Sequence, residues 1–233
     1  MRRLILLFVI VGAMILFVGT SCESRVQVPV PLPEVKVEVP EVELGFKVVK
    51  PTGTEDLFED FESYGQGEVA PFGPWKVLEG FNAPHVEEGV QADKTIGKVL
   101  RADIGRGIFT LGEWTNLTLE CNLKREGSAE GRVYFRLSED GKKGFYVSFS
   151  EYGVALHKFA GSIDMKIAEN KGVKLSGDWM YLKILAEGER IEVFLNGKKV
   201  IDVTDSDVFS GGIGMATTFQ TVFFDNVRVE TIE

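Results

Sequence analysis

The chain has 233 residues, and its 26 lysines and arginines are outnumbered by 35 aspartates and glutamates, which gives a formal net charge of −9. Nucleic-acid binding requires a basic surface that displaces counterions from phosphates, and no basic stripe occurs in the predicted folded part, so nucleic acid is excluded as a partner. Hydrophobic residues make up 44% of the chain and aromatic residues 11%, enough for a packed core. Cys22 and Cys121 are too few for a disulfide framework or a cysteine metal site.

Residues 1–21 have the organisation of a bacterial signal peptide. Two arginines precede an uninterrupted apolar run over positions 4–18, which is shorter than the roughly 20 residues of a membrane-spanning helix. The small residues before Cys22 resemble a lipobox, although Gly19 stands where that pattern usually has an aliphatic residue. We therefore predict cleavage before Cys22, lipidation of this cysteine and a membrane-anchored lipoprotein of the cell envelope, periplasmic or at the surface. The alternative is ordinary cleavage and secretion.

Residues 22–54 are predicted to form an extended linker rich in proline, valine and glutamate. Four of the eight prolines lie between positions 29 and 40, where a missing N–H group and a fixed φ oppose helix and central strand alike. A polyproline-like stretch of about 30 residues reaches about 90 Å. Because the valines alternate with polar residues, the other interpretation is a β-edge arm that folds back onto the body.

The body, residues 55–233, is dominated by alternation of apolar and polar residues. Every second residue is apolar in Leu117–Leu123, Val133–Leu137, Phe145–Phe149, Ile163–Ile167 and Ile191–Leu195. Asn196-Gly197 is a strong hairpin signal, and no window of a dozen residues keeps a helical period. About a dozen such strands are more than one flat sheet comfortably holds. We therefore predict an all-β fold of two stacked antiparallel sheets, a jelly-roll-like sandwich.

The order of several motifs in the body resembles a known superfamily. These motifs include Asp60–Tyr64, Trp114–Glu120, Gly131–Arg136, Ile191–Gly197 and Phe224–Val229. In this order they resemble the concanavalin A-like lectin/glucanase superfamily, and within it laminin-G-like domains, fructan-binding modules and the 3-keto-disaccharide hydrolase group. The resemblance covers roughly residues 57–231 and is specific for fold rather than activity. It implies a carbohydrate-related role.

The sequence lacks the catalytic string of the glucanases in this superfamily. Those enzymes carry Glu-x-Asp-x-Glu or Glu-x-Asp-x-x-Glu on one strand, where alternation places the carboxylates on a single face. Neither string occurs here, and no Gly-x-Ser-x-Gly motif is present. The two histidines, His85 and His157, are about 70 residues apart and do not make a zinc site with two cysteines. We therefore name no catalytic residues, and keep a hydrolase of modified disaccharides as an alternative.

A sugar-binding surface is predicted around the strand at positions 132–137. If the apolar residues of this strand face inward, its polar residues face outward, and neighbouring strands add further side chains beside them. Aromatic rings stack on the C–H faces of sugars, while guanidinium and hydroxyl groups bond their hydroxyls. The predicted sugar-binding residues are Arg132, Tyr134, Arg136, Tyr146 and His157. The other interpretation is that the tyrosines merely cover the sheet and the arginines pair with surface acids.

A calcium site is predicted where the two ends of the body meet. Glu59, Asp60 and Glu62 lie near its start and Asp225 near its end, so pairing of the first and last strands would bring them together. Clustered carboxylates with backbone carbonyls supply the oxygen ligands that Ca²⁺ prefers. No cofactor is required by this interpretation beyond a structural Ca²⁺, and solvated acids at a sheet edge are the alternative.

These features together predict a non-catalytic carbohydrate-binding domain displayed at the bacterial cell envelope. Its partners would be a polysaccharide or oligosaccharide and, through the N-terminal lipid, a membrane. The hydrolase alternative requires two carboxylates facing one another in a concave pocket. A structural or adhesive envelope protein, the third possibility, would instead present a flat apolar patch.

Overall fold

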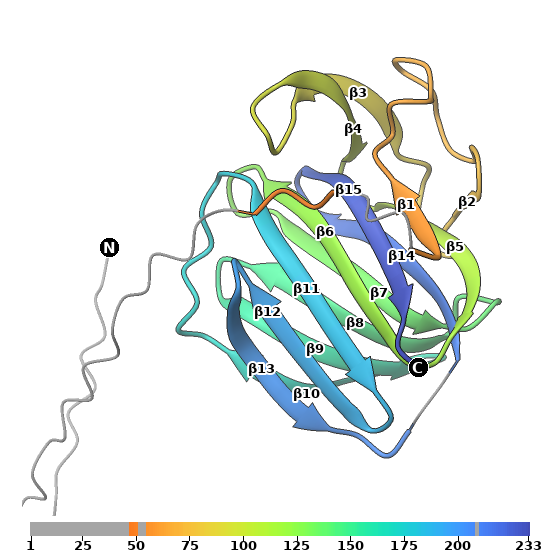
Figure 1. Ribbon diagram of the computed structural model, residues 1–233, viewed down its shortest axis with the longest axis vertical. Coiled ribbons are helices and arrows are strands. Elements are labelled where there is room, and N and C mark those ends of the chain that lie inside the picture. Colours follow the sequence, from red (N-terminus) through yellow and green to blue (C-terminus); the bar gives the residue numbers. More distant parts are fainter. Residues whose placement is uncertain (1–46, 51–54, 208–209) are drawn as a thin grey trace, which may run out of the picture. The chain divides into compact units, whose positions relative to one another are not determined.

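A computed structural model describes residues 47–50, 55–207 and 210–233 of the protein, and every regular element in these ranges is a β-strand (Figure 1). The strands are β1 (Leu57–Glu59), β2 (Trp75–Val77), β3 (His85–Val90), β4 (Ile96–Ala102), β5 (Arg106–Trp114), β6 (Leu117–Arg125), β7 (Glu130–Leu137), β8 (Lys143–Ser150), β9 (Gly153–Ala160), β10 (Ile163–Asn170), β11 (Met180–Glu187), β12 (Arg190–Leu195), β13 (Lys198–Thr204), β14 (Gly211–Phe219) and β15 (Val222–Thr231). The predicted signal peptide, Cys22 and most of the predicted linker lie outside the described residues. Within the described ranges, no helix has the length and apolar character to cross a membrane.

The strands form two antiparallel sheets that lie face to face (Figure 1). The eight-stranded sheet has the order β13-β12-β11-β6-β15-β4-β3, with β1 paired to β15. The seven-stranded sheet has the order β10-β9-β8-β7-β14-β5-β2. The predicted two-sheet sandwich is confirmed, and so is the pairing of the first and last strands of the body. The three-residue strands β1 and β2 are too short to show a period in the sequence.

The core between the sheets contains the residues that alternate in the sequence. Leu117, Leu119 and Leu123 of β6 are fully buried, as are Phe145 and Phe149 of β8 on the opposite sheet. Burial of each side chain of this kind contributes about 1.5–3 kcal/mol relative to exposure, so the two facing rows dominate the stability of the fold. The hairpin between β12 and β13 turns at Asn196 and Gly197, whose φ angles are 49° and 78°. These left-handed conformations are what the Asn-Gly pair predicts.

The alternating apolar residues Ile163 and Met165 are exposed, unlike those of the strands that form the core. These side chains of β10 are 63% and 50% exposed, although the alternation predicts an inward apolar face. The reason is that β10 is the outermost strand of its sheet. An edge strand has neighbours on one side only, so its apolar face is covered incompletely.

Residues 47–50, which we placed in the linker, lie against the outer face of the eight-stranded sheet. Asn122 points outward between the core residues of β6; its Oδ1 accepts from the Val49 N–H at 3.0 Å and its Nδ2 donates to the Lys47 carbonyl at 3.0 Å. Lys47 Nζ donates to the hydroxyl of Tyr181 at 3.2 Å. Val49 and Asn122 are buried in consequence. This short segment therefore covers polar side chains that would otherwise face solvent.

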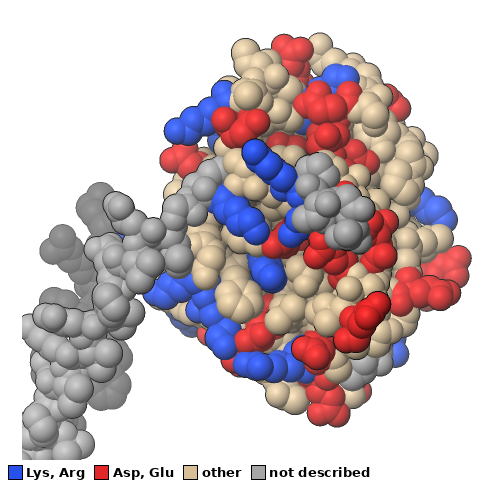
Figure 2. All heavy atoms as spheres, viewed as in Figure 1, with Lys and Arg blue, Asp and Glu red and all other residues tan. Residues whose placement is uncertain are grey.

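Charged side chains of both signs occur on the face seen in Figure 2. The exposed ion pairs among the described residues include that of Arg190 with Asp202 at 2.9 Å. Such surface pairs contribute at most about 1 kcal/mol each. The charge distribution therefore has less influence on stability than the core.

Candidate functional site

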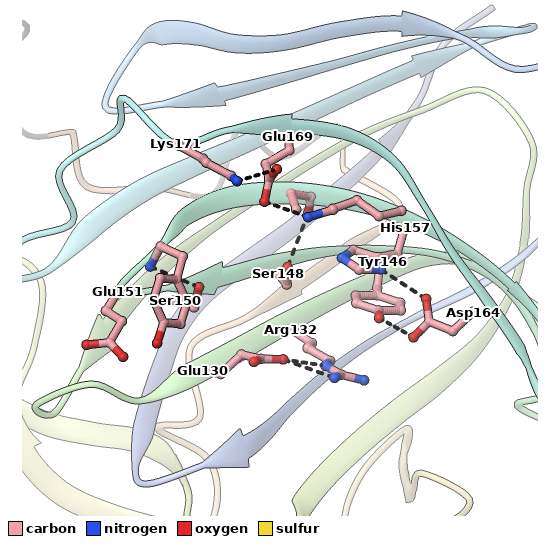
Figure 3. Close-up of a pocket in the computed structure, with 13 residues that line it drawn as sticks. Glu130, Arg132, Tyr146, Ser148, Ser150, Glu151, His157, Asp164, Glu169 and Lys171 are labelled. Atoms are coloured by element: carbon pink, nitrogen blue, oxygen red, sulfur yellow. Dashed lines mark hydrogen bonds and ion pairs between the residues drawn. The ribbon is translucent and has the colours of Figure 1, made fainter. Parts of the chain in front are cut away.

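A groove of about 720 Å³ lies on the outer face of the seven-stranded sheet, along strands β7 to β10 (Figure 3). Antiparallel register places Arg132 of β7 opposite Ser148 of β8, and Tyr146 of β8 opposite His157 of β9. Because successive side chains of a strand point to opposite faces, these residues project outward while their neighbours form the core. Polar side chains therefore predominate in the lining, among them Glu130, Arg132, Ser148, Ser150, Glu151, His157, Asp164, Lys166, Glu169 and Lys171.

The rings of Tyr146 and His157 stack in this groove, and Asp164 of β10 holds both. The ring centroids are 4.6 Å apart with an angle of 11° between the planes. The Tyr146 hydroxyl donates to Asp164 Oδ2 at 2.5 Å, and His157 Nδ1 lies 2.9 Å from Asp164 Oδ1. Since a carboxylate only accepts, Nδ1 is the donor in this bond, and in the neutral imidazole Nε2 is then the acceptor nitrogen. The side chain of His157 keeps 19% of its surface exposed.

Burial raises the pKa of Tyr146, and its hydrogen bond to Asp164 raises that pKa further. The phenol therefore stays protonated at physiological pH. A protonated Tyr146 is a fixed donor to Asp164, which orients the carboxylate toward His157 (Figure 3). The three side chains form one preorganised unit, which we call the Tyr146–His157–Asp164 cluster.

Arg132 lies beside this cluster, as predicted from the alternation in β7. Its Nη2 and Nε donate to Glu130 Oε1 at 2.9 and 3.1 Å, and its guanidinium carbon lies 4.7 Å from the centre of the Tyr146 ring. Tyr134 also lies on this face, but it is only 5% exposed and its ring centroid is 5.2 Å from that of Tyr146. Tyr134 therefore supports the floor of the groove, whereas Arg132 can contact a ligand.

Arg136 does not belong to this surface, contrary to the prediction. Its side chain is fully buried; Nε donates to the carbonyl of Thr115 at 2.6 Å and Nη2 to that of Gly188 at 2.9 Å. The pairing of β7 with β14 shifts register before Leu137, and Arg136 has a φ of 49°. This irregularity interrupts the alternation, so Leu137 packs with Tyr134 on the outer side and Arg136 reaches the turns at the end of the sandwich.

The sequence analysis missed the groove residues of β10. Asp164 and Lys166 occupy the polar positions between Ile163, Met165 and Ile167, so the alternation itself contained the signal. The pairing of β10 with β9 brings Asp164 opposite Phe159, two residues from His157. That placement depends on the register between two strands, which the sequence of either strand alone does not specify.

Glu59 of the predicted calcium cluster is engaged by other groups of the protein. It is buried; its Oε1 accepts from the Phe61 N–H at 2.8 Å, and its Oε2 accepts from the Tyr64 hydroxyl at 2.7 Å and the Trp75 indole N–H at 3.0 Å. Burial and the hydrogen bond to Glu59 raise the pKa of Tyr64. Both oxygens of Glu59 are thus engaged with donors, and its role in the fold is to bond the indole of a core tryptophan.

Of the other three acidic residues, Asp225 is affected by the charges of Asp60 and Glu62. Asp225 of β15 is fully buried; its Oδ1 accepts from the Asn226 N–H at 2.8 Å, and its Oδ2 has no hydrogen-bond partner among the described residues. Burial raises the pKa of Asp225 to about 8, and the nearby charges of Asp60 and Glu62 act in the same direction. Glu62 Oε1 already accepts from the Lys98 N–H at 2.7 Å.

The described residues contain no group of three or more His, Cys, Asp or Glu side chains able to hold a metal ion. Asp225 Oδ2 is buried and has no hydrogen-bond partner among the described residues, which leaves it free to bind a cation. Calcium at this position would have to draw its remaining ligands from Asp60, Glu62 and backbone carbonyls. The calcium site stays a prediction, without Glu59.

Comparison with known proteins gives one family and several relatives. The family model of the 3-keto-alpha-glucoside-1,2-lyase-like domain matches residues 54–230. An uncharacterized protein of Methanocaldococcus jannaschii is 32% identical over 186 residues, which cover 77% of this chain and 81% of the relative. The levanase of Bacillus subtilis is 29% identical over 148 residues, which cover 61% of this chain and only 22% of the levanase.

Solved structures share the same architecture. The carbohydrate binding module CBM66 from Bacillus subtilis aligns with a TM-score of 0.55 and 25% identity, over 69% of this chain and 98% of that module. The β-glucanase of Bacillus licheniformis aligns with a TM-score of 0.53 and 12% identity, over 78% of this chain and all of that enzyme, which shows the fold alone. The match to the family model over most of the body, together with this shared concanavalin A-like jelly roll, shows that the chain belongs to the 3-keto-alpha-glucoside-1,2-lyase-like domain family.

Proposed function

We propose that the body binds a carbohydrate in the groove along β7 to β10. The observation that carries this proposal is the Tyr146–His157–Asp164 cluster with Arg132 beside it. A sugar presents C–H faces that pack on rings and hydroxyls that need directional donors and acceptors, and this groove offers both. The likeness to a carbohydrate binding module supports the same ligand class.

The proposal includes display of this domain at the cell envelope. The signal-like segment at positions 1–21 and the cysteine that follows it support export and lipid anchoring. Labelling of the protein with a radioactive fatty acid in a bacterial host tests the anchor. The label is expected on the wild-type chain and not on Cys22→Ala, and equal labelling of both would contradict it.

Alanine at His157 or Arg132 is expected to weaken carbohydrate binding by about tenfold or more. Each substitution removes a hydrogen-bonding group and a stacking surface from the groove; a hydrogen bond contributes about 0.5–1.5 kcal/mol, and about 1.5–3 kcal/mol where a charged group such as the Arg132 guanidinium takes part. Binding is measured by calorimetry with the tightest ligand found on an array of α-glucosides, fructans and arabinans.

The chain offers matched controls for this experiment. His85 of β3 lies on the other sheet, and Arg190 of β12 pairs with Asp202 on the surface. His85→Ala and Arg190→Ala are expected to bind like the wild type. If the groove variants bind as tightly as these controls, the ligand lies elsewhere and the proposal is wrong.

A lyase acting on a 3-keto-glucoside is the second candidate, and one observation favours it. The bond of His157 Nδ1 with Asp164 leaves Nε2 as a base on the groove, an arrangement suited to removing a proton. In a 3-keto-glucoside the proton on C2 is acidified by the neighbouring ketone. Once Nε2 takes that proton, the electron pair forms the C1–C2 double bond, the C1–O bond breaks, and the leaving oxygen recovers a proton from the imidazolium. Asp164 would stabilise that imidazolium.

Turnover of p-nitrophenyl 3-keto-α-glucoside tests the lyase. If the candidate is correct, the wild type releases nitrophenol and His157→Ala is slower by about 10²–10⁴-fold, since general-base catalysis contributes on this scale. Asp164→Asn should retain part of the rate, and His85→Ala all of it. No release above buffer by the wild type would leave binding as the function of the groove.

A further inference from the structure

The groove along β7 to β10 continues well beyond the Tyr146–His157–Asp164 cluster. Its lining includes Ser148 and Ser150 of β8, and then Tyr152 in the turn that joins β8 to β9. Because a strand rises about 3.3 Å per residue, the stretch of β8 from Tyr146 to Ser150 spans about 13 Å. This length exceeds that of two sugar rings, so a single sugar over the cluster would leave much of the groove empty.

Small side chains form the floor between the two ends of the groove. Antiparallel register pairs Ser148 of β8 with Ala155 of β9, and Ser150 lies two residues further along β8. Figure 3 shows Ser148 between Arg132 and Glu169. The longer side chains on the two sides come from β7 and β10 and include Glu130, Arg132, Lys166 and Glu169. The floor is thus a trough along β8 and β9, a shape that suits a linear chain.

An exposed aromatic ring lies at the far end of this floor. Tyr152 is 72% exposed, whereas Tyr146 at the other end is only 3% exposed. The Tyr152 N–H donates to Ser150 Oγ at 3.2 Å, and a hydrogen bond with Glu151 raises the pKa of the Tyr152 phenol. Both the backbone and the hydroxyl of this residue are therefore held by neighbours. A ring that is exposed and lines the groove offers a face on which the C–H side of a sugar packs.

The charged groups of the groove are paired with one another. Arg132 Nη2 donates to Glu130 Oε1 at 2.9 Å. Lys166 Nζ and Lys171 Nζ lie 2.6 and 3.5 Å from the two carboxylate oxygens of Glu169. The lining contains these three fixed cations and four carboxylates, which are Glu130, Glu151, Asp164 and Glu169. An acidic sugar would therefore meet no spare cation among the lining residues and one carboxylate in excess, and uncompensated like charges disfavour binding.

We propose that the groove binds a linear saccharide of three or more units without acidic groups, and that the unit at the far end stacks on Tyr152. This inference rests on the proposed function, because it places the first unit over the Tyr146–His157–Asp164 cluster. The middle of the chain lies over Ser148 and Ala155, where the charged side chains on both sides of the floor can bond its hydroxyls.

Calorimetry with short and long probes of the same kind tests this inference. The probes are maltose and maltotetraose, inulobiose and inulotetraose, and arabinobiose and arabinotetraose. In the series that binds, the tetrasaccharide is expected to bind about tenfold or more tightly than the disaccharide, since it adds a stacked ring and further hydrogen bonds. Tyr152→Ala should bring the affinity for the tetrasaccharide close to that for the disaccharide. Tyr152→Phe, which keeps the ring, should retain most of the difference.

Ile96→Ala is the matched control for the loss of an exposed apolar side chain. Ile96 of β4 is 75% exposed and belongs to the other sheet, so this variant should bind both probes like the wild type. The same tetrasaccharide with its primary hydroxyls oxidised to carboxylates should bind at least about tenfold more weakly.

The outcomes separate this inference from the proposed function. Equal affinity of the wild type for the disaccharide and the tetrasaccharide, or a difference that survives Tyr152→Ala, would overturn the extended site while the sugar site over the cluster stands. Equal or tighter binding of the oxidised chain would overturn the exclusion of acidic sugars. Absence of binding by every probe would overturn both this inference and the proposed function.

Discussion

Replacing Glu59 by alanine is expected to lower the free energy of unfolding by about 2–4 kcal/mol. The carboxylate accepts hydrogen bonds from the Phe61 N–H, the Tyr64 hydroxyl and the Trp75 indole. Trp75 is 1% exposed and Phe61 fully buried, so two of these donors would be left without water. Each buried donor without a partner costs about 1–3 kcal/mol, and the missing side chain also leaves a cavity.

Urea unfolding measures this loss, with Glu62→Ala as the matched control. Glu62 is a nearby carboxylate on an exposed residue that bonds Gln91 and the Lys98 N–H, and its removal is expected to cost about 1 kcal/mol or less. Glu59→Gln, which keeps one acceptor, should fall between the two alanine variants. A Glu59→Ala protein as stable as the wild type would show that these three bonds do not hold this end of the body together.

Asparagine at Asp225 is expected to stabilise the protein progressively as the pH rises from about 5 to 8. Burial raises the pKa of Asp225 to about 8, whereas an unfolded carboxyl of this type titrates near 3.9. The folded state therefore holds the proton more tightly, and the stability tied to it is full below about pH 3.9 and lost as the pH rises toward 8. At about 1.4 kcal/mol per pH unit, the loss is of the order of a few kcal/mol.

The comparison of wild type with Asp225→Asn isolates this contribution from that of other carboxyls. The two proteins should have similar unfolding free energies near pH 4, and the variant should be more stable by about 2 kcal/mol or more at pH 8. Asp207→Asn, at an ion pair with Lys158, serves as a control for removal of an exposed charge. Parallel stability curves for wild type and Asp225→Asn would contradict the raised pKa.

The same pair of proteins tests the predicted calcium site. Calcium bound at Asp225 Oδ2 would replace the proton, so added Ca²⁺ at pH 8 should stabilise the wild type and leave Asp225→Asn unchanged. A chelator should reverse the effect. Equal responses of the two proteins to Ca²⁺ would show that this carboxyl binds no calcium.

The fold was predictable because the inward-facing residues of both sheets are buried in the same core. In β6 and β8 each inward position faces the opposite sheet, so alternation and burial coincide from Leu117 to Leu123 and from Phe145 to Phe149. The sequence does not reveal where this regularity stops. The left-handed φ of Arg136 and the edge position of β10 are properties of the assembled sheets, and neither has a local signature.

The candidate site was predictable only in part, for the same reason. Arg132, Tyr134 and Tyr146 follow from alternation within β7 and β8, and His157 follows from the next strand. Asp164 completes the cluster from β10, and its contribution depends on the register of a third strand pair. Glu59 was predicted as a cation ligand because its type and position suit one, whereas the packing of Trp75 and Tyr64 against it decides its role.

The central claim, that a carbohydrate binds over the Tyr146–His157–Asp164 cluster, is tested most directly by the two histidine rings. The chain has only His85 and His157, on different sheets, so the imidazole NMR spectrum resolves one reporter in the groove and one away from it. Titration with the tightest carbohydrate ligand found on the array is predicted to shift the His157 signals and leave those of His85 in place. Saturable binding that leaves the His157 signals unmoved would contradict this account.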